Sequence, residues 1–278
     1  MLRLLITQLA VSKRLRALGT QAGTVLIVRT RPLKATQAGK LLFKHAIQMR
    51  LLQADLTPDF QDLAPGRRSG AGEDMSIRIA VNSDSIATWA LPALDQLAQG
   101  GLSLMIIADD QDLTHDWLRE GKVLGCVTTL KHALRRCKVV PLGAMHYLVV
   151  ASAHYANAHC PEGLTQHNLC KIPFVAFNRK DDLQAEFVSK ACGLKRVILT
   201  QRYVPSFEGQ VRAVLAGWGV SVVPEMLVAD MLDSGQLINL SPQFSLPVSL
   251  YWDCWKLDSA VLDSLTQTLQ SAAKFALN

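Results

Sequence analysis

Short apolar strands alternate with helical segments from Ser76 to the end of this 278-residue chain. Ile77–Val81 predicts a buried strand, and a helical pattern over about Ser85–Gln99 follows it. The alternation restarts at Pro173–Phe177, and a late strand at Val248–Trp255 precedes a closing helix. This order predicts an α/β fold with a mostly parallel sheet and helices on both of its faces.

A polar, glycine-rich segment separates this α/β part from the N-terminal part. Residues 61–75 read QDLAPGRRSGAGEDM and contain Pro65, Gly66, Gly70 and Gly72. Such a composition is typical of a linker. We therefore place the clearest domain boundary of the chain here.

The positive charge of the chain is concentrated at its beginning. The first 50 residues hold ten Lys or Arg and no Asp or Glu, whereas the formal net charge of the whole chain is +6. The excess is thus confined to this segment, because the rest of the chain is net acidic. A local basic excess is the electrostatic signature of phosphate contact, and a solvated basic helix is the alternative.

The same segment has a distinct order of elements. Thr7 is suited to cap a helix whose apolar residues Val11, Leu15 and Leu18 form one stripe. The β-branched run Val25–Thr30 predicts a short strand, after which Thr36 can cap a long helix over residues 37–60. The long helix carries an apolar stripe that suits either dimerisation or packing on a core.

Three consecutive submotifs carry a family resemblance: TQLAVSKRLRAL, LIVRT and LKATQAG. In this order they resemble the recognition helix, wing and linker-helix start of LysR-type transcriptional regulators. GWGVSVVP at 217–224 resembles the Gly-x-Gly segment of the family's second lobe. The resemblance implies a partial winged helix-turn-helix, a linker helix and a two-lobed, periplasmic-binding-protein-like (type 2) effector domain. The implied parts are residues 1–36 (DNA reader), 37–60 (dimerisation helix), 61–75 (hinge), 76–160 with 241–278 (lobe 1) and 161–240 (lobe 2).

The resemblance also implies which residues contact double-stranded promoter DNA. They lie on the recognition helix and the wing: Thr7, Gln8, Ser12, Lys13, Arg14, Arg16, Arg29 and Arg31. Family members carry a whole helix before the point where Met1 stands. Two alternatives follow: the true start lies upstream, or the chain is a truncated, dominant-negative regulator with impaired DNA binding.

Polar side chains follow several predicted strands, where open α/β sheets bind ligands. Helix starts at such strand ends also offer N–H groups to a ligand carboxylate, although ordinary helix capping is the alternative at Asp84 and Ser206. The candidate ligand-binding residues are Asn82, Ser83, Asp84, Ser85, Trp89, Thr128, Phe177, Asp181, Asp182, Ser206 and Glu208.

The segment AVNSDSIATW at 80–89, with LPAL after it, resembles the subgroup that controls arginine and lysine export. This implies lysine or arginine as effector, amino-acid export genes as targets, a homodimer or homotetramer, and RNA polymerase as a further candidate partner. We expect Asp84 or Asp182 to pair with the ammonium or guanidinium of the ligand. The sequence does not choose between lysine and arginine.

The sequence lacks the motifs that mark several other functional classes. The chain has no H-E-x-x-H or G-x-S-x-G motif, no G-x-G-x-x-G after a first strand, and no C-x-x-C pair among its six cysteines. We therefore expect no enzyme activity, no metal and no cofactor. The sequence shows neither a long apolar span nor a secretory signal, which favours the cytoplasm over the membrane. A solute-binding protein of the same lobe architecture is an alternative that the basic first segment disfavours.

Overall fold

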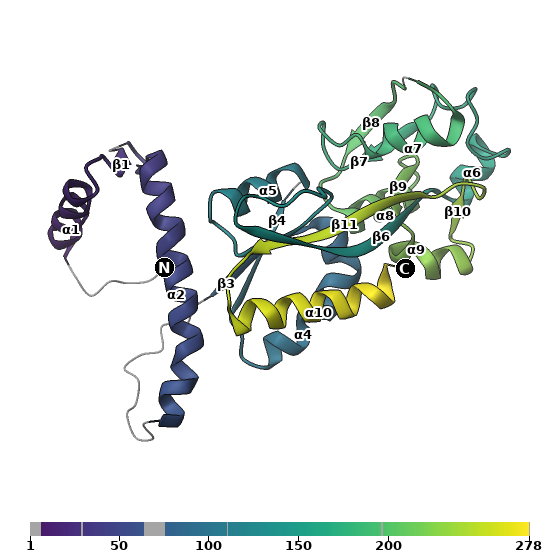
Figure 1. Cartoon of the computed structure of the whole chain (residues 1–278). Coiled ribbons are helices and arrows are strands. Elements are labelled where there is room, and N and C mark those ends of the chain that lie inside the picture. Colours follow the sequence, from purple (N-terminus) through teal and green to yellow (C-terminus); the bar gives the residue numbers. More distant parts are fainter. Residues whose placement is uncertain (1–6, 29, 64–75, 110, 196, 278) are drawn as a thin grey trace.

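The computed structural model describes residues 7–28, 30–63, 76–109, 111–195 and 197–277. Two parts are visible in Figure 1: a small N-terminal part with the long helix α2, and a larger α/β part beside it. The predicted Arg29 and most of the predicted hinge lie outside the described residues.

The N-terminal part follows the predicted order of elements. Its elements are α1 (Gln8–Gln21), β1 (Ile27–Val28), β2 (Lys34–Ala35) and α2 (Gln37–Leu63). Both predicted caps are present, because the Thr7 hydroxyl accepts the Ala10 N–H at 3.3 Å and the Thr36 hydroxyl accepts the Gly39 N–H at 3.1 Å. The Thr36 hydroxyl also donates to the Val25 carbonyl at 2.7 Å, so it ties α2 to the β1–β2 hairpin.

The larger part is built on a seven-stranded sheet with the order β10-β6-β11-β5-β3-β4, in which β9 also pairs with β6. The prediction of a mostly parallel sheet was wrong. Among the described strands of this sheet, only β3–β4 and β3–β5 are parallel pairs, since the long strands β6 and β11 run antiparallel to each other and to their other neighbours. The strands are β3 (Ile77–Asn82), β4 (Leu104–Asp109), β5 (Gly125–Thr128), β6 (Cys137–Ser152), β9 (Ser221–Pro224), β10 (Leu237–Asn239) and β11 (Leu246–Trp255).

A second, two-stranded parallel sheet lies at the upper right of Figure 1. It pairs β7 (Pro173–Ala176) with β8 (Thr200–Tyr203), and Phe174 bridges to Val220 next to β9. The two sheets thus meet where β7 approaches β9.

Helices cover the strands and bury one continuous apolar core. A π-helical turn η1 (Ile86–Ala90) interrupts the helix that follows β3. The helices are α3 (Ser83–Ser85), α4 (Leu91–Gln99), α5 (Gln111–Arg119), α6 (Ala153–His159), α7 (Leu183–Cys192), α8 (Phe207–Leu215), α9 (Glu225–Asp233) and α10 (Ala260–Ala276). None of the helices within the described ranges is long and apolar enough to cross a membrane.

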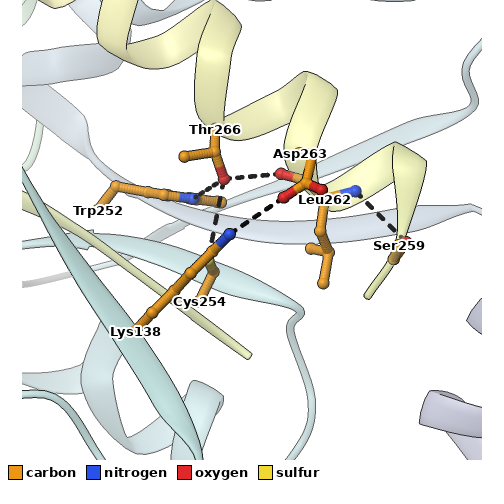
Figure 2. A network of polar contacts seen from close by, with 7 residues as sticks. All are labelled: Lys138, Trp252, Cys254, Ser259, Leu262, Asp263 and Thr266. Atoms are coloured by element: carbon orange, nitrogen blue, oxygen red, sulfur yellow. Dashed lines mark hydrogen bonds and ion pairs between the residues drawn. The ribbon is translucent and has the colours of Figure 1, made fainter. Parts of the chain in front are cut away.

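Helix α10 is fastened to β11 by the polar network of Figure 2. The Trp252 indole N–H donates to the Thr266 hydroxyl at 3.1 Å, and this hydroxyl donates to the Leu262 carbonyl at 2.7 Å. Cys254 Sγ lies 3.9 Å from the same hydroxyl. Because these groups are buried, the hydroxyl satisfies an indole N–H that water cannot reach.

Replacing Thr266 by Val is expected to lower the free energy of unfolding by about 2 kcal/mol, because the buried indole N–H of Trp252 loses its acceptor. Urea denaturation measures this as a lower midpoint. Thr266→Ser keeps the hydroxyl and is the control. Equal midpoints for the two variants would contradict the role given to the hydroxyl.

Candidate functional site

A cavity of about 480 Å³ opens beyond the end of β3, and three regions of the fold supply its walls. The first is the turn into α3 with the residue after β5, the second is the loop after β7 with α7 and α8, and the third is β11. The lining residues are Asn82, Ser83, Asp84, Thr129, Phe177, Lys180, Asp181, Asp182, Leu183, Glu186, Phe207, Pro247, Val248, Ser249 and Tyr251.

Asp84 is the buried carboxylate of this cavity, with 1% of its surface exposed. One oxygen accepts the Ser85 N–H at 3.0 Å and a hydrogen bond from the Asn82 amide, and the other accepts the Tyr147 hydroxyl. Burial raises the pKa of Asp84 from 3.8 to about 7, and the charge of Asp181 adds to this effect. A cation placed beside Asp84 would favour its ionised form.

Three buried polar atoms near Asp84 find no hydrogen-bond partner in the described part of the chain. They are Asn82 Oδ1, Ser85 Oγ and Trp89 Nε1. Buried polar groups are normally satisfied, since an unmet one costs about 1–3 kcal/mol. Asn82 itself lines the cavity, so its free carbonyl oxygen offers an acceptor to a bound donor.

The opposite wall of the cavity carries three further acids. Asp181 is held in place because its carboxylate accepts the N–H groups of Phe177 and Leu183, each at 3.0 Å. Asp182 is exposed and makes no side-chain cap for α7. Glu186 lies one turn further along α7, where Lys190 pairs with it at 2.7 Å. The cavity is therefore strongly acidic, with Lys180 as the cation among its lining residues.

Aromatic rings form the apolar part of the wall. The rings of Phe177 and Phe207 lie 5.8 Å apart, and the ring of Phe207 lies 6.5 Å from that of Tyr147. Of these rings, Phe177 and Phe207 line the cavity, and together with Tyr251 they can cover an aliphatic chain. The arrangement suits a ligand with a short apolar stem and a cationic group.

The structure brings together some of the predicted ligand-binding residues and not others. Six line the cavity: Asn82, Ser83, Asp84, Phe177, Asp181 and Asp182. Five are not among its lining residues: Ser85, Trp89, Thr128, Ser206 and Glu208.

Helix geometry explains why two of the five predictions miss the cavity. The Ser206 hydroxyl caps α8 by accepting the Gly209 N–H at 3.2 Å, and Glu208 is exposed. The residue between them, Phe207, is the one that turns into the cavity. The capping alternative that the sequence left open at Ser206 is the one that the structure has.

Sequence reasoning missed the contribution of β11 to the site. Ser249 and Tyr251 line the cavity although they lie more than 160 positions after Asp84 in the chain. Neither was among the predicted ligand-binding residues, because it is the pairing of β11 with the distant strands β5 and β6 that brings them to the site. Glu186 could have been found, since it lies one helical turn after Asp182 on α7.

The predicted DNA-contacting residues are exposed wherever the structure describes them. Thr7, Gln8, Ser12, Lys13, Arg14, Arg16 and Arg31 are all exposed, on or next to α1 or just after β1. Arg29 lies outside the described residues.

The apolar stripe of α1 is open to solvent in the described structure. None of the residues of α1 is buried, and Leu15 and Leu18 are 37% and 42% exposed. A hollow of about 860 Å³ lies between α1 and the β1–β2 hairpin, with Val11 and Leu26 among its lining residues. These side chains are thus incompletely covered by the residues that the structure describes.

Within the described ranges, no group of three or more His, Cys, Asp or Glu side chains could hold a metal ion. The α/β part of the chain holds an acidic cavity. The N-terminal part consists of a basic helix, a hairpin and the long helix α2. Residues 70–274 match the LysR substrate binding domain family, so the chain belongs to the LysR family of transcriptional regulators.

Two transcriptional regulators are similar to this chain over almost its whole length. The HTH-type transcriptional regulator LysG of Mycobacterium tuberculosis (strain ATCC 25618 / H37Rv) is 39% identical over 272 residues, which cover 98% of this chain and 86% of the relative. ArgP of Aeromonas salmonicida is 36% identical over 276 residues, which cover 99% of this chain and 90% of the relative.

Solved structures agree with the described fold. The crystal structure of ArgP from Mycobacterium tuberculosis has a TM-score of 0.86 at 37% identity and covers 99% of this chain and 91% of that one. Full-length LysG of Corynebacterium glutamicum with bound effector Arg has a TM-score of 0.76 at 33% identity. That match covers 98% of this chain and 90% of that one.

Proposed function

We propose that this chain is a DNA-binding transcriptional regulator that senses a basic amino acid, arginine or lysine. The observation that carries the proposal is the acidic cavity, in which Asp84, Asp181, Asp182 and Glu186 face aromatic side chains. Charge complementarity of this kind selects cations over neutral and anionic ligands. The effector Arg bound by LysG of Corynebacterium glutamicum supports the same ligand class.

The chemistry of the cavity suggests how the ligand is held. Asp84 and the free carbonyl oxygen of Asn82 accept hydrogen bonds from one cationic group of the ligand. Asp182 and Glu186 attract the other cationic group at the α7 wall. Lys180 and the hydroxyl of Ser83 are the available partners for the ligand carboxylate.

The remaining parts of the proposal follow the family. Residues 1–36 read promoter DNA, 37–60 pair two copies into a homodimer or homotetramer, and 61–75 act as the hinge. Residues 76–160 with 241–278 form one lobe of the sensor, and residues 161–240 form the other. The protein acts in the cytoplasm on genes for amino-acid export, with RNA polymerase as a further partner and without catalysis.

Fluorescence anisotropy on the DNA upstream of the gene tests the proposal. The full chain is titrated onto this DNA and onto a scrambled duplex, over a salt series, with and without L-arginine and L-lysine. We expect preferential binding to the native DNA that weakens with salt and changes with either amino acid. Equal binding to both duplexes, unaffected by either amino acid, would contradict it.

A second candidate is a sensor that binds the amino acid but holds DNA poorly. The exposure of Leu15 and Leu18 on α1 favours it, because an incompletely covered recognition helix is poorly braced. Intact affinity for arginine together with weak, non-specific DNA binding would select this alternative.

Ligand affinity is expected to depend on pH through Asp84. The pKa of this carboxyl is about 7 in the ligand-free fold and 3.8 as an unperturbed group. The folded, ligand-free protein therefore holds a proton between these values that the unfolded chain has released. Its stability accordingly falls as pH rises from about 4 to 7.

A cationic ligand requires the ionised form, so its binding releases this proton below pH 7. We expect the dissociation constant for L-arginine to rise roughly tenfold from pH 8 to pH 6. Calorimetry in two buffers of different ionisation enthalpy measures both the affinity and the proton release. A dissociation constant that stays constant over this range would count against an ionised Asp84 in the complex.

A further inference from the structure

One face of α2 rests against the α/β part of the molecule. Lys40, Lys44, Ile47 and Leu51 recur at steps of four, three and four residues, so they lie on one side of the helix. Leu51 is fully buried in the core of the α/β part, and Ile47 packs against this core. Other apolar residues of α2 remain exposed, among them Leu41 and Met49, both at 59%.

The N-terminal half of this face contacts the loop that joins α5 to β5. Lys40 Nζ lies 2.7 Å from one carboxylate oxygen of Glu120, and Lys122 Nζ lies 2.8 Å from the other. The pKa of Glu120 is lowered to about 2 by the hydrogen bonds from Lys122 and Lys40, so its charge persists at physiological pH. Gly121 lies so close to the Lys44 side chain that an added Cβ would meet Lys44 Cβ at 2.8 Å.

The same Lys44 also reaches the end of β11. Its ammonium lies 5.6 Å from the ring centroid of Trp255, which is fully buried. This distance is within the range of a cation–π contact. Helix α2 therefore contacts both the loop that leads into β5 and the end of β11.

The two strands lead from this contact directly to the cavity. They pair antiparallel from Cys254 opposite Gly125 to Tyr251 opposite Thr128. Tyr251 lines the cavity, and so does Thr129, the residue after β5. Four residues of strand span about 13 Å, so the cavity and the α2 contact lie at the two ends of one short, paired segment.

Strand β11 is also joined to α10 by contacts of its side chains with Thr266. Trp252 and Cys254 point to α10, where the network of Figure 2 fastens them to Thr266. Alternate residues point the other way, so Tyr251 faces the cavity while Asp253 lies 3.6 Å from His115 of α5. The strand thus forms a continuous packed connection between Tyr251 at the cavity and Trp255 at the α2 contact.

We propose that the contact of Lys40 and Lys44 with Glu120 and Trp255 couples the occupancy of the cavity to the position of α2. This inference rests on the proposed function, since it takes a basic amino acid as the ligand. Partly exposed ion pairs and cation–π contacts are weak, so modest shifts of β11 and of the loop before β5 can make or release them. Glu120 and Lys44 are positioning residues, because neither touches the ligand.

Reciprocity makes the proposal testable by ligand binding alone. If ligand binding changes the equilibrium constant of the α2 contact by some factor, then formation of the contact changes the ligand affinity by the same factor. Weakening the contact must therefore shift the dissociation constant of the ligand. The test is calorimetry of L-arginine with the full chain and with Glu120→Gln and Lys44→Met. The matched control is Asp116→Asn, which removes a charge from the ion pair of Asp116 with Arg119 on α5.

The two variants separate coupling from long-range electrostatics. Through simple Coulomb effects, loss of the negative Glu120 would weaken the binding of a cation, and loss of the positive Lys44 would strengthen it. Through a shared contact, both variants shift the dissociation constant in the same direction, and we expect at least about a threefold shift in each. The control is expected to bind as the wild type does.

Three outcomes would overturn the proposal. The coupling would be contradicted by unchanged dissociation constants, by shifts in opposite directions, or by an equal shift in Asp116→Asn. None of these results would contradict the proposed amino-acid site. Absence of any binding heat with the wild-type protein, for L-arginine and L-lysine alike, would instead remove the proposed function and the coupling with it.

Discussion

Replacing Asp84 by Asn is expected to weaken the binding of L-arginine by about 100-fold. Such a loss corresponds to about 3 kcal/mol, the size typical for removing one partner of a buried, hydrogen-bonded charge pair. The asparagine side chain would keep the shape of the aspartate: its carbonyl can accept the hydrogen bonds from the Ser85 N–H and the Asn82 amide, and its NH2 group can donate to the Tyr147 hydroxyl oxygen. The charge is therefore the property that this substitution removes.

The same substitution should stabilise the ligand-free protein. At pH 8 the fold must hold Asp84 ionised although its pKa is raised to about 7 by burial, which favours the neutral carboxyl. Asn carries no charge at any pH, so we expect the melting temperature of Asp84→Asn at pH 8 to exceed that of the wild type by a few degrees. A variant that is more stable and yet binds less cannot be explained by misfolding.

Two further variants make this result interpretable. Asp95→Asn is the control, because Asp95 is an exposed acid on α4 that hydrogen-bonds to Gln99 at 2.6 Å and lies outside the cavity lining. Asp182→Asn tests the second acid at the cavity rim. If calorimetry finds the affinities for arginine and lysine unchanged in both Asp84→Asn and Asp182→Asn, the pairing of these acids with the ligand cation is wrong.

Replacing Gly219 by Ala is expected to lower the free energy of unfolding by about 3 kcal/mol. Gly219 has a φ of 137°, a region that residues with a Cβ rarely adopt. An added Cβ would also collide with the Pro173 carbonyl oxygen and approach Pro173 Cγ to 2.9 Å. Backbone strain contributes about 1–2 kcal/mol, and overpacking contributes about 1–3 kcal/mol.

The close approach has a structural reason. The Val220 N–H donates to the Pro173 carbonyl at 3.0 Å, and the Val175 N–H donates to the Val220 carbonyl at 2.7 Å. These two bonds join β7 to the segment that enters β9, so a shift there opens the junction between the two sheets.

Gly217→Ala is the control for this prediction. Gly217 also has a positive φ of 79°, but an added Cβ would meet nothing within 4 Å. We expect a loss of about 1 kcal/mol from backbone strain alone. Urea denaturation of both variants measures the difference, and equal losses would show that the contact with Pro173 contributes little.

The sequence predicted those features that depend on neighbouring residues. The caps at Thr7 and Thr36 are visible in a few consecutive letters because a hydroxyl reaches an N–H three residues ahead. Asp84 and Asp181 were found in the same way, as polar residues at the ends of buried strands. The three N-terminal submotifs likewise pointed to the LysR family, to which residues 70–274 independently belong.

Tertiary structure alone decided what depends on pairing between distant segments. The antiparallel course of β6 and β11 overturned the expectation of a mostly parallel sheet, since alternation of strands and helices does not encode strand direction. Tyr251 lines the cavity, and Glu120 contacts Lys40, which lies 80 positions earlier in the chain. No local sequence pattern predicts either contact. Local chemistry therefore determined where elements begin and which acids lie at strand ends, whereas packing determined which side chains share a cavity and where α2 contacts the α/β part.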